Sequence, residues 1–310
     1  MKHTIAPKTW YVDTEYQDEP HLIATGVLET DAGLVLVDPG PTVSLGGLTR
    51  NLEAAGARLA DVRAILLTHI HLDHAGGTGT LVQAHPSMKV YVHEIGARHM
   101  IAPERLLASA RRIYGEAMDT MWGAFLPVPE ANVVRLRGGE TLDLGGRTLQ
   151  VAYTPGHAIH HVSYLDGASG TAFVGDVAGM RVAGDPVVLP VTPPPDISLE
   201  QWRVSLDVVR LWQPERLFLT HFGPAEDVAW HLHSLERALD RWADRVRVSL
   251  SDDRDDEARA RAFEATVFAE LREKLSPEAF RAYEAFGQPE GSWYGLARYW
   301  RKKMPGRGRK

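Results

Sequence analysis

Two hydrophobic patterns alternate along the first two thirds of the chain. Short runs of aliphatic and β-branched residues, bounded by Gly, Pro or Asp, are typical of buried strands. Longer stretches with apolar residues three or four positions apart are typical of helices that pack on a core. The predicted strands span residues 22–30, 34–37, 62–68, 90–93, 133–136, 141–144, 148–153, 161–165, 171–174 and 216–220.

Two helices are predicted between these strands. The first covers residues 44–55. The second begins at Ser198, where Gln201 three residues later forms a capping-box pattern, and Pro214 ends it. The alternation of strands and helices indicates a mixed α and β fold.

Two further segments are predicted to be helical and lie apart from this alternation. Residues 103–125 interrupt the sheet elements, so we interpret them as an insertion that could form a lid. From residue 224 onward the chain is predicted to be mostly helical, with an apolar stripe over residues 228–242, a charged break at residues 252–257, and a further helix after it. We therefore divide the chain into a catalytic domain, residues 1–245, and a C-terminal helical extension, residues 246–310.

The composition excludes several classes of site and partner. The chain of 310 residues has no cysteine, which excludes disulfides, thiolate zinc sites and a cysteine nucleophile. Its net charge of -6 argues against a nucleic-acid partner, because phosphate binding depends on Lys and Arg. Neither a signal peptide nor an apolar run of about 18 residues is evident, so we expect a cytoplasmic protein without a membrane partner. Its oligomeric state stays open.

The strongest chemical feature is the run of residues 68–77, which holds three histidines and an aspartate just after a predicted strand. In an extended segment, residues two apart point the same way, so His69 and His71 can bind one ion together. Asp73 and His74 lie past the turn and can face a second ion. Imidazole and carboxylate groups suit zinc, and also iron or manganese.

This run resembles the signature of the metallo-β-lactamase superfamily. Three later segments resemble further motifs of that family in the same order: residues 154–157, 173–176 and 219–223. An upstream turn, residues 37–40, also resembles a family turn. The resemblance covers roughly residues 20 to 235 and leaves the C-terminal extension outside it.

The resemblance implies a fold and a set of metal ligands. The implied fold is α+β, a four-layered αββα sandwich with the site along one edge. Asp38 either accepts a proton from a ligand imidazole or is a plain turn residue. The implied ligands are His69, His71 and His157 for a first metal, Asp73, His74 and His221 for a second, and Asp176 as a bridge between them.

The resemblance also implies a hydrolase with two divalent metal ions, zinc first. A metal-bound hydroxide would attack an ester, thioester or lactone, and Asp73 would orient it or take its proton. Asp176 at the bridging position and the lack of cysteine resemble the glyoxalase II and lactonase branch more than true β-lactamases. The alternatives are a mononuclear iron enzyme that oxidises persulfides, and a phosphodiesterase or nuclease of the same superfamily. The expected partner is a small-molecule substrate.

Several other polar and aromatic residues have structural interpretations. We expect His161 to form a structural hydrogen bond, and we assign His160 no role. His231 and His233 are expected to be solvated or packed, because residues two apart on a helix do not face each other. The aromatic cluster around Trp293 is expected to pack between helices rather than line a pocket.

Overall fold

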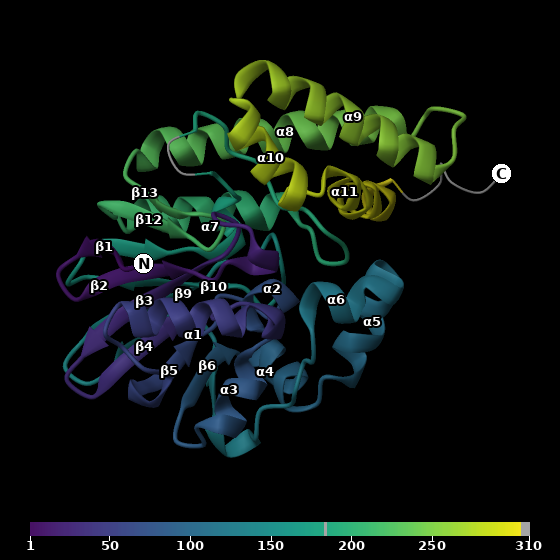
Figure 1. Cartoon of the computed structure of the whole chain (residues 1–310). Helices are drawn as coiled ribbons and strands as arrows, with labels where there is room; N and C mark the ends of the chain where they lie inside the picture. Colours follow the sequence, from purple (N-terminus) through teal and green to yellow (C-terminus); the bar gives the residue numbers. More distant parts are fainter. Residues whose placement is uncertain (183–184, 305–310) are drawn as a thin grey trace.

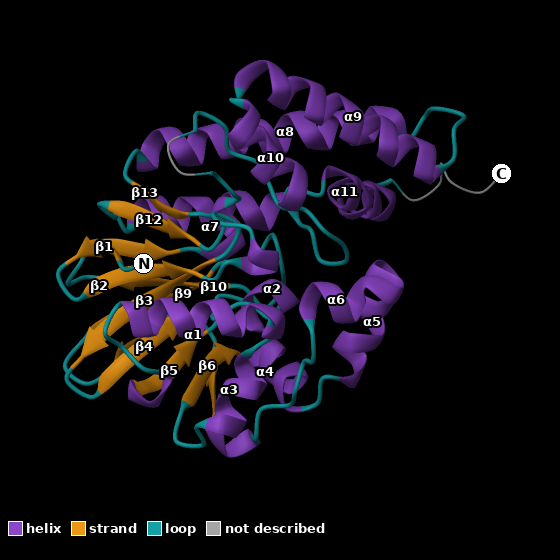
Figure 2. Ribbon diagram, in the orientation of Figure 1, coloured by secondary structure: helices purple, strands orange, loops and turns teal. Residues whose placement is uncertain are grey.

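The computed structural model describes residues 1–182 and 185–304, and it confirms the predicted α+β sandwich. Two β-sheets lie face to face, with helices on the outer face of each (Figure 1). Figure 2 separates the helices, in purple, from the strands of the two sheets, in orange. Further helices extend the layer that covers the second sheet.

The first sheet has seven strands in chain order. Its first four strands pair antiparallel, and the last four are parallel. The parallel strands send their carboxyl ends to the same edge of the sheet. The strands are β1 (His3–Ala6), β2 (Thr9–Asp13), β3 (Ala24–Thr30), β4 (Gly33–Val37), β5 (Val62–Leu66), β6 (Lys89–His93) and β7 (Val133–Leu136).

The second sheet has six strands in the order β13-β12-β11-β10-β9-β8. All neighbours pair antiparallel except β11 and β12, which are parallel. The strands are β8 (Thr141–Asp143), β9 (Thr148–Tyr153), β10 (Val162–Asp166), β11 (Thr171–Phe173), β12 (Arg216–Leu219) and β13 (Gly223–Ala225).

Eleven α-helices lie in the described part of the chain. Helices α1, α3 and α4 cover the first sheet, and α7 and α8 cover the second (Figure 1). The helices are α1 (Leu45–Ala54), α2 (Leu72–Ala75), α3 (Thr78–Ala84), α4 (Glu94–Ile101), α5 (Glu104–Tyr114), α6 (Met118–Trp122), α7 (Leu199–Leu211), α8 (Val228–Ser249), α9 (Asp256–Lys274), α10 (Pro277–Phe286) and α11 (Pro289–Lys303).

Strand alternation produces the layers. In β4, Val35 and Val37 point into the core between the two sheets, whereas Leu36 points to the core beneath α1. A strand buried on both faces needs apolar residues throughout, which is why this segment reads as a continuous hydrophobic run. Because β4 is packed on both faces, its register with the neighbouring strands is fixed. The position of the strand end is then fixed as well.

The C-terminal helices share a core with the second sheet. Trp242 of α8, Phe263 of α9 and Trp293 of α11 belong to the same buried cluster as Leu217 of β12. The boundary proposed near residue 245 falls inside α8, and residues 305–310 of the proposed extension lie outside the described part. The division into two domains stays a prediction.

The structure corrects two local predictions and confirms a third. Strands β1, β2 and β13 were not predicted, although β2 has the aromatic and β-branched composition of a strand. The capping box at Ser198 is wrong, because its side chain accepts no hydrogen bond at the start of α7. Residues 103–125 form two helices, α5 and α6, as the helical pattern predicted.

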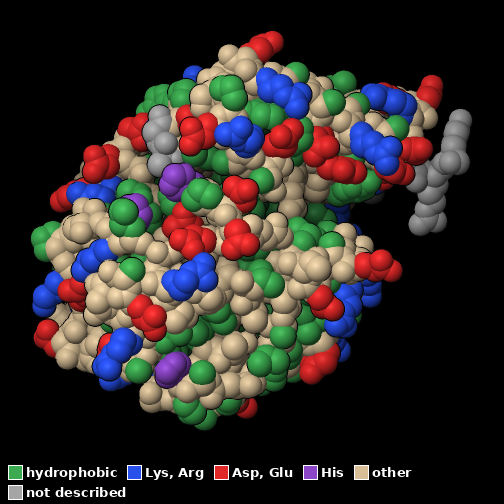
Figure 3. All heavy atoms as spheres, viewed as in Figure 1, with side chains coloured by type: hydrophobic (Ala, Val, Ile, Leu, Met, Phe, Trp, Pro, Cys, Tyr) green, Lys and Arg blue, Asp and Glu red, His purple; other side chains and the backbone are tan. Residues whose placement is uncertain are grey.

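The surface is charged and mixed. Acidic and basic side chains are interspersed on the face seen in Figure 3. Within the described residues, no helix combines the length and the apolar character needed to cross a membrane.

Candidate metal centre

All seven predicted ligand residues lie together at one edge of the sandwich, and each follows the carboxyl end of a strand. His69 and His71 lie in the loop after β5, and Asp73 and His74 lie in the short helix α2 that follows it. The other three come from the second sheet, after β9, β11 and β12. Long-range strand packing therefore brings together side chains about 150 positions apart in the sequence.

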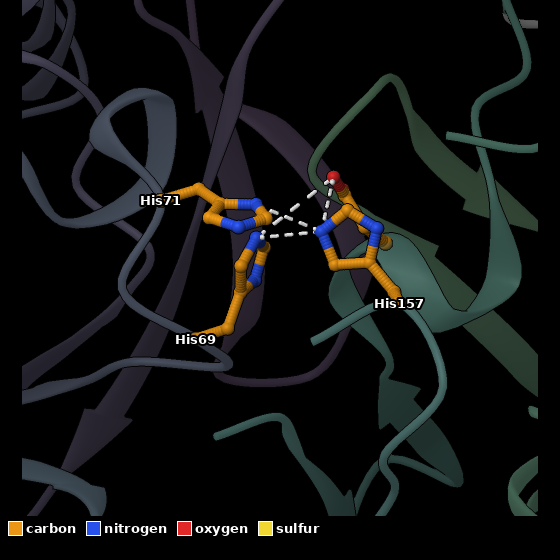
Figure 4. A group of neighbouring side chains, drawn as sticks. His69, His71 and His157 are labelled. Carbon is orange, nitrogen blue, oxygen red and sulfur yellow. Dashed lines mark hydrogen bonds and ion pairs between the residues drawn. The ribbon is translucent and has the colours of Figure 1, made fainter. Parts of the chain in front are cut away.

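The first group consists of His69, His71, His157 and Asp176. The Nε2 atom of His157 lies 3.2 Å from Nε2 of His69 and 2.9 Å from Nδ1 of His71. Its distance to Oδ2 of Asp176 is 3.5 Å. Figure 4 shows the three imidazoles turned toward one another and toward the carboxylate. Four ligand atoms thus surround one point.

The second group consists of Asp73, His74, His221 and again Asp176. The Nε2 atoms of His74 and His221 lie 3.2 Å apart. Oδ2 of Asp73 lies 3.3 Å from Nε2 of His221, and Oδ1 of Asp176 lies 3.2 Å from Nε2 of His74. The two oxygens of Asp176 therefore face different groups, as expected of a bridging carboxylate.

The protonation of the imidazoles is fixed by their outward nitrogens. Nδ1 of His157 donates to the carbonyl of Val191 at 2.7 Å, and Nδ1 of His221 donates to the carbonyl of Leu22 at 2.8 Å. A carbonyl can only accept, so in the neutral rings each Nε2 carries a lone pair. These lone pairs point into the two groups, where a cation would receive them.

Asp38 is the central hydrogen-bond acceptor behind the two groups. It is fully buried, and its carboxylate accepts hydrogen bonds from Nδ1 of His74 at 2.9 Å, from the backbone N–H and hydroxyl of Thr68, and from the hydroxyl of Thr220. The contact with a candidate ligand imidazole is the one that the sequence suggested. Its φ of 50° is an unfavourable backbone conformation for a non-glycine residue, and these hydrogen bonds hold it there.

Electrostatics favour a cation at this place. Burial lowers the pKa of His69 well below its usual value, and the neighbouring imidazoles lower it further. Burial opposes ionisation of Asp176, but His74 and His221 hold the pKa of that carboxyl well below its usual range. Oδ1 of Asp176 is buried and faces Nε2 of His74 at 3.2 Å and Nε2 of His221 at 3.6 Å. A buried anionic oxygen is costly unless paired, so this donor set fits a divalent ion.

A glycine is required directly before Asp176. Gly175 has a φ of 44°, and a Cβ atom there would lie 2.4 Å from the hydroxyl oxygen of Thr68. The same Cβ would lie 2.9 Å from Nε2 of His161. A side chain at this position would therefore displace the loop that carries the shared carboxylate.

The remaining histidines largely follow their predictions. Nδ1 of His161 forms the expected hydrogen bond, at 2.9 Å from the hydroxyl of Thr154. His231 is buried and Nε2 donates to the carbonyl of Ala178 at 2.8 Å, whereas His233 is exposed. His160, which had no assigned role, lines the cavity beside the candidate ligands.

A cavity of about 290 Å³ opens directly above the two groups. His71, Asp73 and Asp176 form its floor. One wall comes from α4, α5 and α6, and the facing wall comes from the segment around Pro194 and from the α10–α11 region (Figure 1). The insertion and the C-terminal helices therefore both line the cavity.

Several cavity residues were not identified from the sequence. Arg98, Arg105, Tyr114, Trp122 and Phe286 all line it. They lie on elements that the resemblance does not cover or does not place, and none belongs to a motif. The spacing of Leu106, Ala110 and Ile113 along α5 is the only available signal, since it places them on one face of the helix.

Comparison with known proteins identifies the family. The chain matches the metallo-beta-lactamase superfamily model over residues 19–221. A metallo-beta-lactamase fold-containing protein of Sulfurisphaera tokodaii is 35% identical over 49% of this chain and 58% of its own length. Hydroxyacylglutathione hydrolases of Synechococcus sp. and Vibrio campbellii are 29% and 28% identical, over 52% and 66% of this chain and 52% and 64% of their own lengths. The chain thus spans between about half and two thirds of these relatives.

Solved structures show the same fold. A metallo-beta-lactamase family protein of Thermus thermophilus superposes with a TM-score of 0.69, covering 97% of this chain and 95% of its own at 22% identity. An archaeal superfamily protein of Sulfolobus tokodaii has a TM-score of 0.65, covering 89% and 93% at 24% identity. With the family match over residues 19–221, which is more than half of the sequence, these findings show that the chain belongs to the metallo-beta-lactamase superfamily.

Proposed function

We propose that this protein is a binuclear metal-dependent hydrolase that cleaves an ester, thioester or lactone. The observation that carries the proposal is the pair of adjacent His and Asp groups that share Asp176. The pair forms the floor of a cavity with largely apolar walls, which is the usual setting for a small-molecule site.

The residues present would hold two divalent ions. His69, His71 and His157 would hold the first, Asp73, His74 and His221 the second, and Asp176 would bridge them. Zinc suits this set best, with iron or manganese as alternatives. When bound, such ions lower the pKa of a shared water and polarise the carbonyl to be attacked.

Asp73 is the proposed catalytic residue. Its side chain is 17% exposed, and it lines the cavity floor, whereas the other members of its group are buried. Burial opposes its ionisation, yet His74 and His221 lower the pKa of the Asp73 carboxyl, so the group is an ionised carboxylate at neutral pH. It would orient the attacking water and take its proton as the new C–O bond forms and the bond to the leaving oxygen or sulfur breaks.

The backbone and Asp38 would position the imidazoles. The carbonyls of Val191 and Leu22 fix the rings of His157 and His221, and Asp38 fixes His74. Such outer contacts orient the rings and decide which ring nitrogen faces the metal site. The surrounding apolar walls would exclude bulk water and strengthen the electrostatic interactions in the site.

The curated relatives support the hydrolase class. Several of them are named hydroxyacylglutathione hydrolases, a name that denotes hydrolysis of an acyl group from glutathione. Because the chain spans only part of their length, the substrate of those proteins is not transferred to this one. No observation in the structure favours persulfide oxidation or phosphodiester cleavage over acyl hydrolysis.

A substrate panel on metal-stripped and metal-reloaded protein tests the proposal. We expect reloading with Zn²⁺, Mn²⁺ or Fe²⁺ to restore hydrolysis of thioesters or lactones in the panel. Phosphodiesters should be cleaved far more slowly. If the protein holds one iron per chain and consumes oxygen with a persulfide substrate, the enzyme is an oxygenase and not a hydrolase of acyl compounds. If it cleaves phosphodiesters faster than thioesters and lactones, it is a phosphodiesterase.

A further inference from the structure

The mouth of the cavity combines an apolar rim with a cluster of cationic side chains. Ile113 of α5 and Ile159 in the loop after β9 are 49% and 37% exposed, and both line the cavity. Exposed large aliphatic side chains around a cavity are unfavourable in water and mark a surface that a ligand can cover. They come from two segments that are distant in the sequence.

The cationic side chains are Arg98 on α4 and Arg105 on α5. Both are exposed at the cavity wall, and neither forms an ion pair within 4.0 Å among the described residues. Nε of Arg98 instead donates to Nε2 of His99 at 3.2 Å. Two guanidinium groups therefore face the cavity mouth with their charge available.

One carboxylate, Asp196, also lines the cavity, so the two arginines and this aspartate together carry a net positive charge. Burial lowers the pKa of His99, and Arg98 and Arg105 lower it further, while Asp196 opposes them to a smaller degree. The electrostatic potential at His99 is therefore positive. An anion placed there would be attracted by two guanidinium groups and repelled by one carboxylate.

Helix α4 holds this cluster in a fixed place relative to the metal centre. A Cβ atom on Gly96 would lie 2.9 Å from the side chain of Ile70, which separates two of the candidate ligands, and 3.4 Å from Cβ of His160. The helix thus packs directly on the loop of the site. Ile95 and His99, four residues apart, share the face that lines the cavity.

We propose that Arg98 and Arg105 form an anion-binding subsite, so that the substrate is an acyl compound with an apolar portion and an anionic group on the same molecule. The proposal deepens the hydrolase function and rests on it for the position of the scissile bond. The apolar portion would lie against Ile113 and Ile159, and the anionic group, a carboxylate or a phosphate, would lie between the two arginines.

The test separates binding from turnover. Two esters with the same leaving group and chain length serve as substrates: p-nitrophenyl octanoate and the mono-p-nitrophenyl ester of suberic acid, which adds a terminal carboxylate. In R98A/R105A we expect KM for the suberate ester to rise about five- to thirtyfold with kcat unchanged, as for two partly exposed charge contacts. The octanoate ester should change less than twofold.

A matched control is available on α5, the helix that carries Arg105. Arg111 and Arg112 of α5 are exposed, but they do not line the cavity. R111A/R112A removes the same charge from the protein and should leave both KM values unchanged. An equal rise in the two double variants would show that net charge, and not a subsite, governs the effect, and would overturn the proposal.

Calorimetric binding of three non-hydrolysable probes tests the subsite if neither ester is hydrolysed. Octanesulfonate should bind R98A/R105A about five- to thirtyfold more weakly than wild type, in metal-loaded and metal-stripped protein alike. Octanol should bind all variants equally. A larger loss for octyl phosphate than for octanesulfonate would assign a phosphate, and equal losses a singly charged group. Absence of hydrolysis of every ester, thioester and lactone tested would contradict the proposed function, whereas unchanged octanesulfonate affinity would contradict the subsite.

Discussion

The metal centre and the cavity mouth are built in different ways. The candidate ligands follow strand ends of the two sheets, and all but His71 and Asp73 are buried. Backbone carbonyls and Asp38 fix their orientation. The mouth instead consists of partly exposed side chains on α4, α5 and the C-terminal helices.

This difference separates two kinds of role. Side chains at strand ends are held by the sandwich core, so their geometry suits chemistry that tolerates little movement. Side chains on peripheral helices can vary without disturbing that core, so they suit the recognition of a particular substrate. Variants of the centre should therefore lower kcat, and variants of the mouth should change KM.

The largest effect is expected at the cavity floor. Asp73→Asn keeps the size of the side chain but removes the proposed proton acceptor, so kcat should fall about 10²- to 10⁴-fold. The protein should stay folded, because asparagine has the size and shape of aspartate. Initial rates with the best ester or thioester and a chemical denaturation curve measure both. The exposed Asp253→Asn serves as control, and wild-type turnover in Asp73→Asn would remove the proposed mechanism.

The next largest effect is a loss of stability in the core formed by the C-terminal helices. Trp293 is fully buried in the C-terminal helices, and its Nε1 donates to the hydroxyl of Ser249. Trp293→Ala should lower the free energy of unfolding by about 3–5 kcal/mol while the folded fraction keeps its kcat/KM. Trp230→Ala, at a site that is 39% exposed, should cost much less. A change confined to KM would instead place Trp293 in substrate binding.

Asp38 tests whether the support of the centre is separate from its chemistry. Asp38→Asn keeps a residue that tolerates a positive φ but removes the negative charge that accepts from His74. Metal affinity should fall about 10- to 100-fold, and kcat at saturating metal should change little. Competition with a chelator of known affinity measures the first quantity. Unchanged affinity would make Asp38 a plain turn residue.

The smallest effect concerns His231, which links α8 to the loop after Asp176 through the carbonyl of Ala178. Burial lowers the pKa of His231 from 6.5 to about 4, so the folded state keeps it neutral where the unfolded state is protonated. Stability therefore falls as the pH drops from 6.5 toward 4, by about 2 kcal/mol at pH 5 for this group.

Denaturation curves at pH 7 and pH 5 measure this contribution. His231→Gln should lose less stability between the two pH values than wild type does. The exposed His233→Gln, on the same helix, should keep the wild-type pH dependence. Identical slopes in all three proteins would show that His231 is not the responsible group.

The sequence predicted the centre better than the mouth, for physical reasons. His69, His71, Asp73 and His74 are close in sequence, and their spacing alone indicates a metal site. The strands that end at the later ligands are recognisable from continuous apolar runs. The resemblance to the family connected the four motifs, and the structure brings all seven side chains together.

The parts of the site and fold that were not predicted depend on contacts between distant segments, which leave no recognisable pattern in the local sequence. The carbonyls of Val191 and Leu22 orient imidazoles, but any residue type provides a carbonyl. Arg98 and Arg105 meet at the mouth only because α4 packs on the loop of the site. Strand β13 is three residues long and contains Gly and Pro, so its composition argues against a strand although pairing with β12 creates one.

The number of metal ions per chain tests the central claim most directly. Native mass spectrometry of protein reloaded with Zn²⁺ should show two ions in the wild type and no more than one in His221→Ala, with folding confirmed by circular dichroism. A wild-type protein that reaches full hydrolytic activity with a single ion, or that retains none of the added metal, would contradict a binuclear centre built around Asp176.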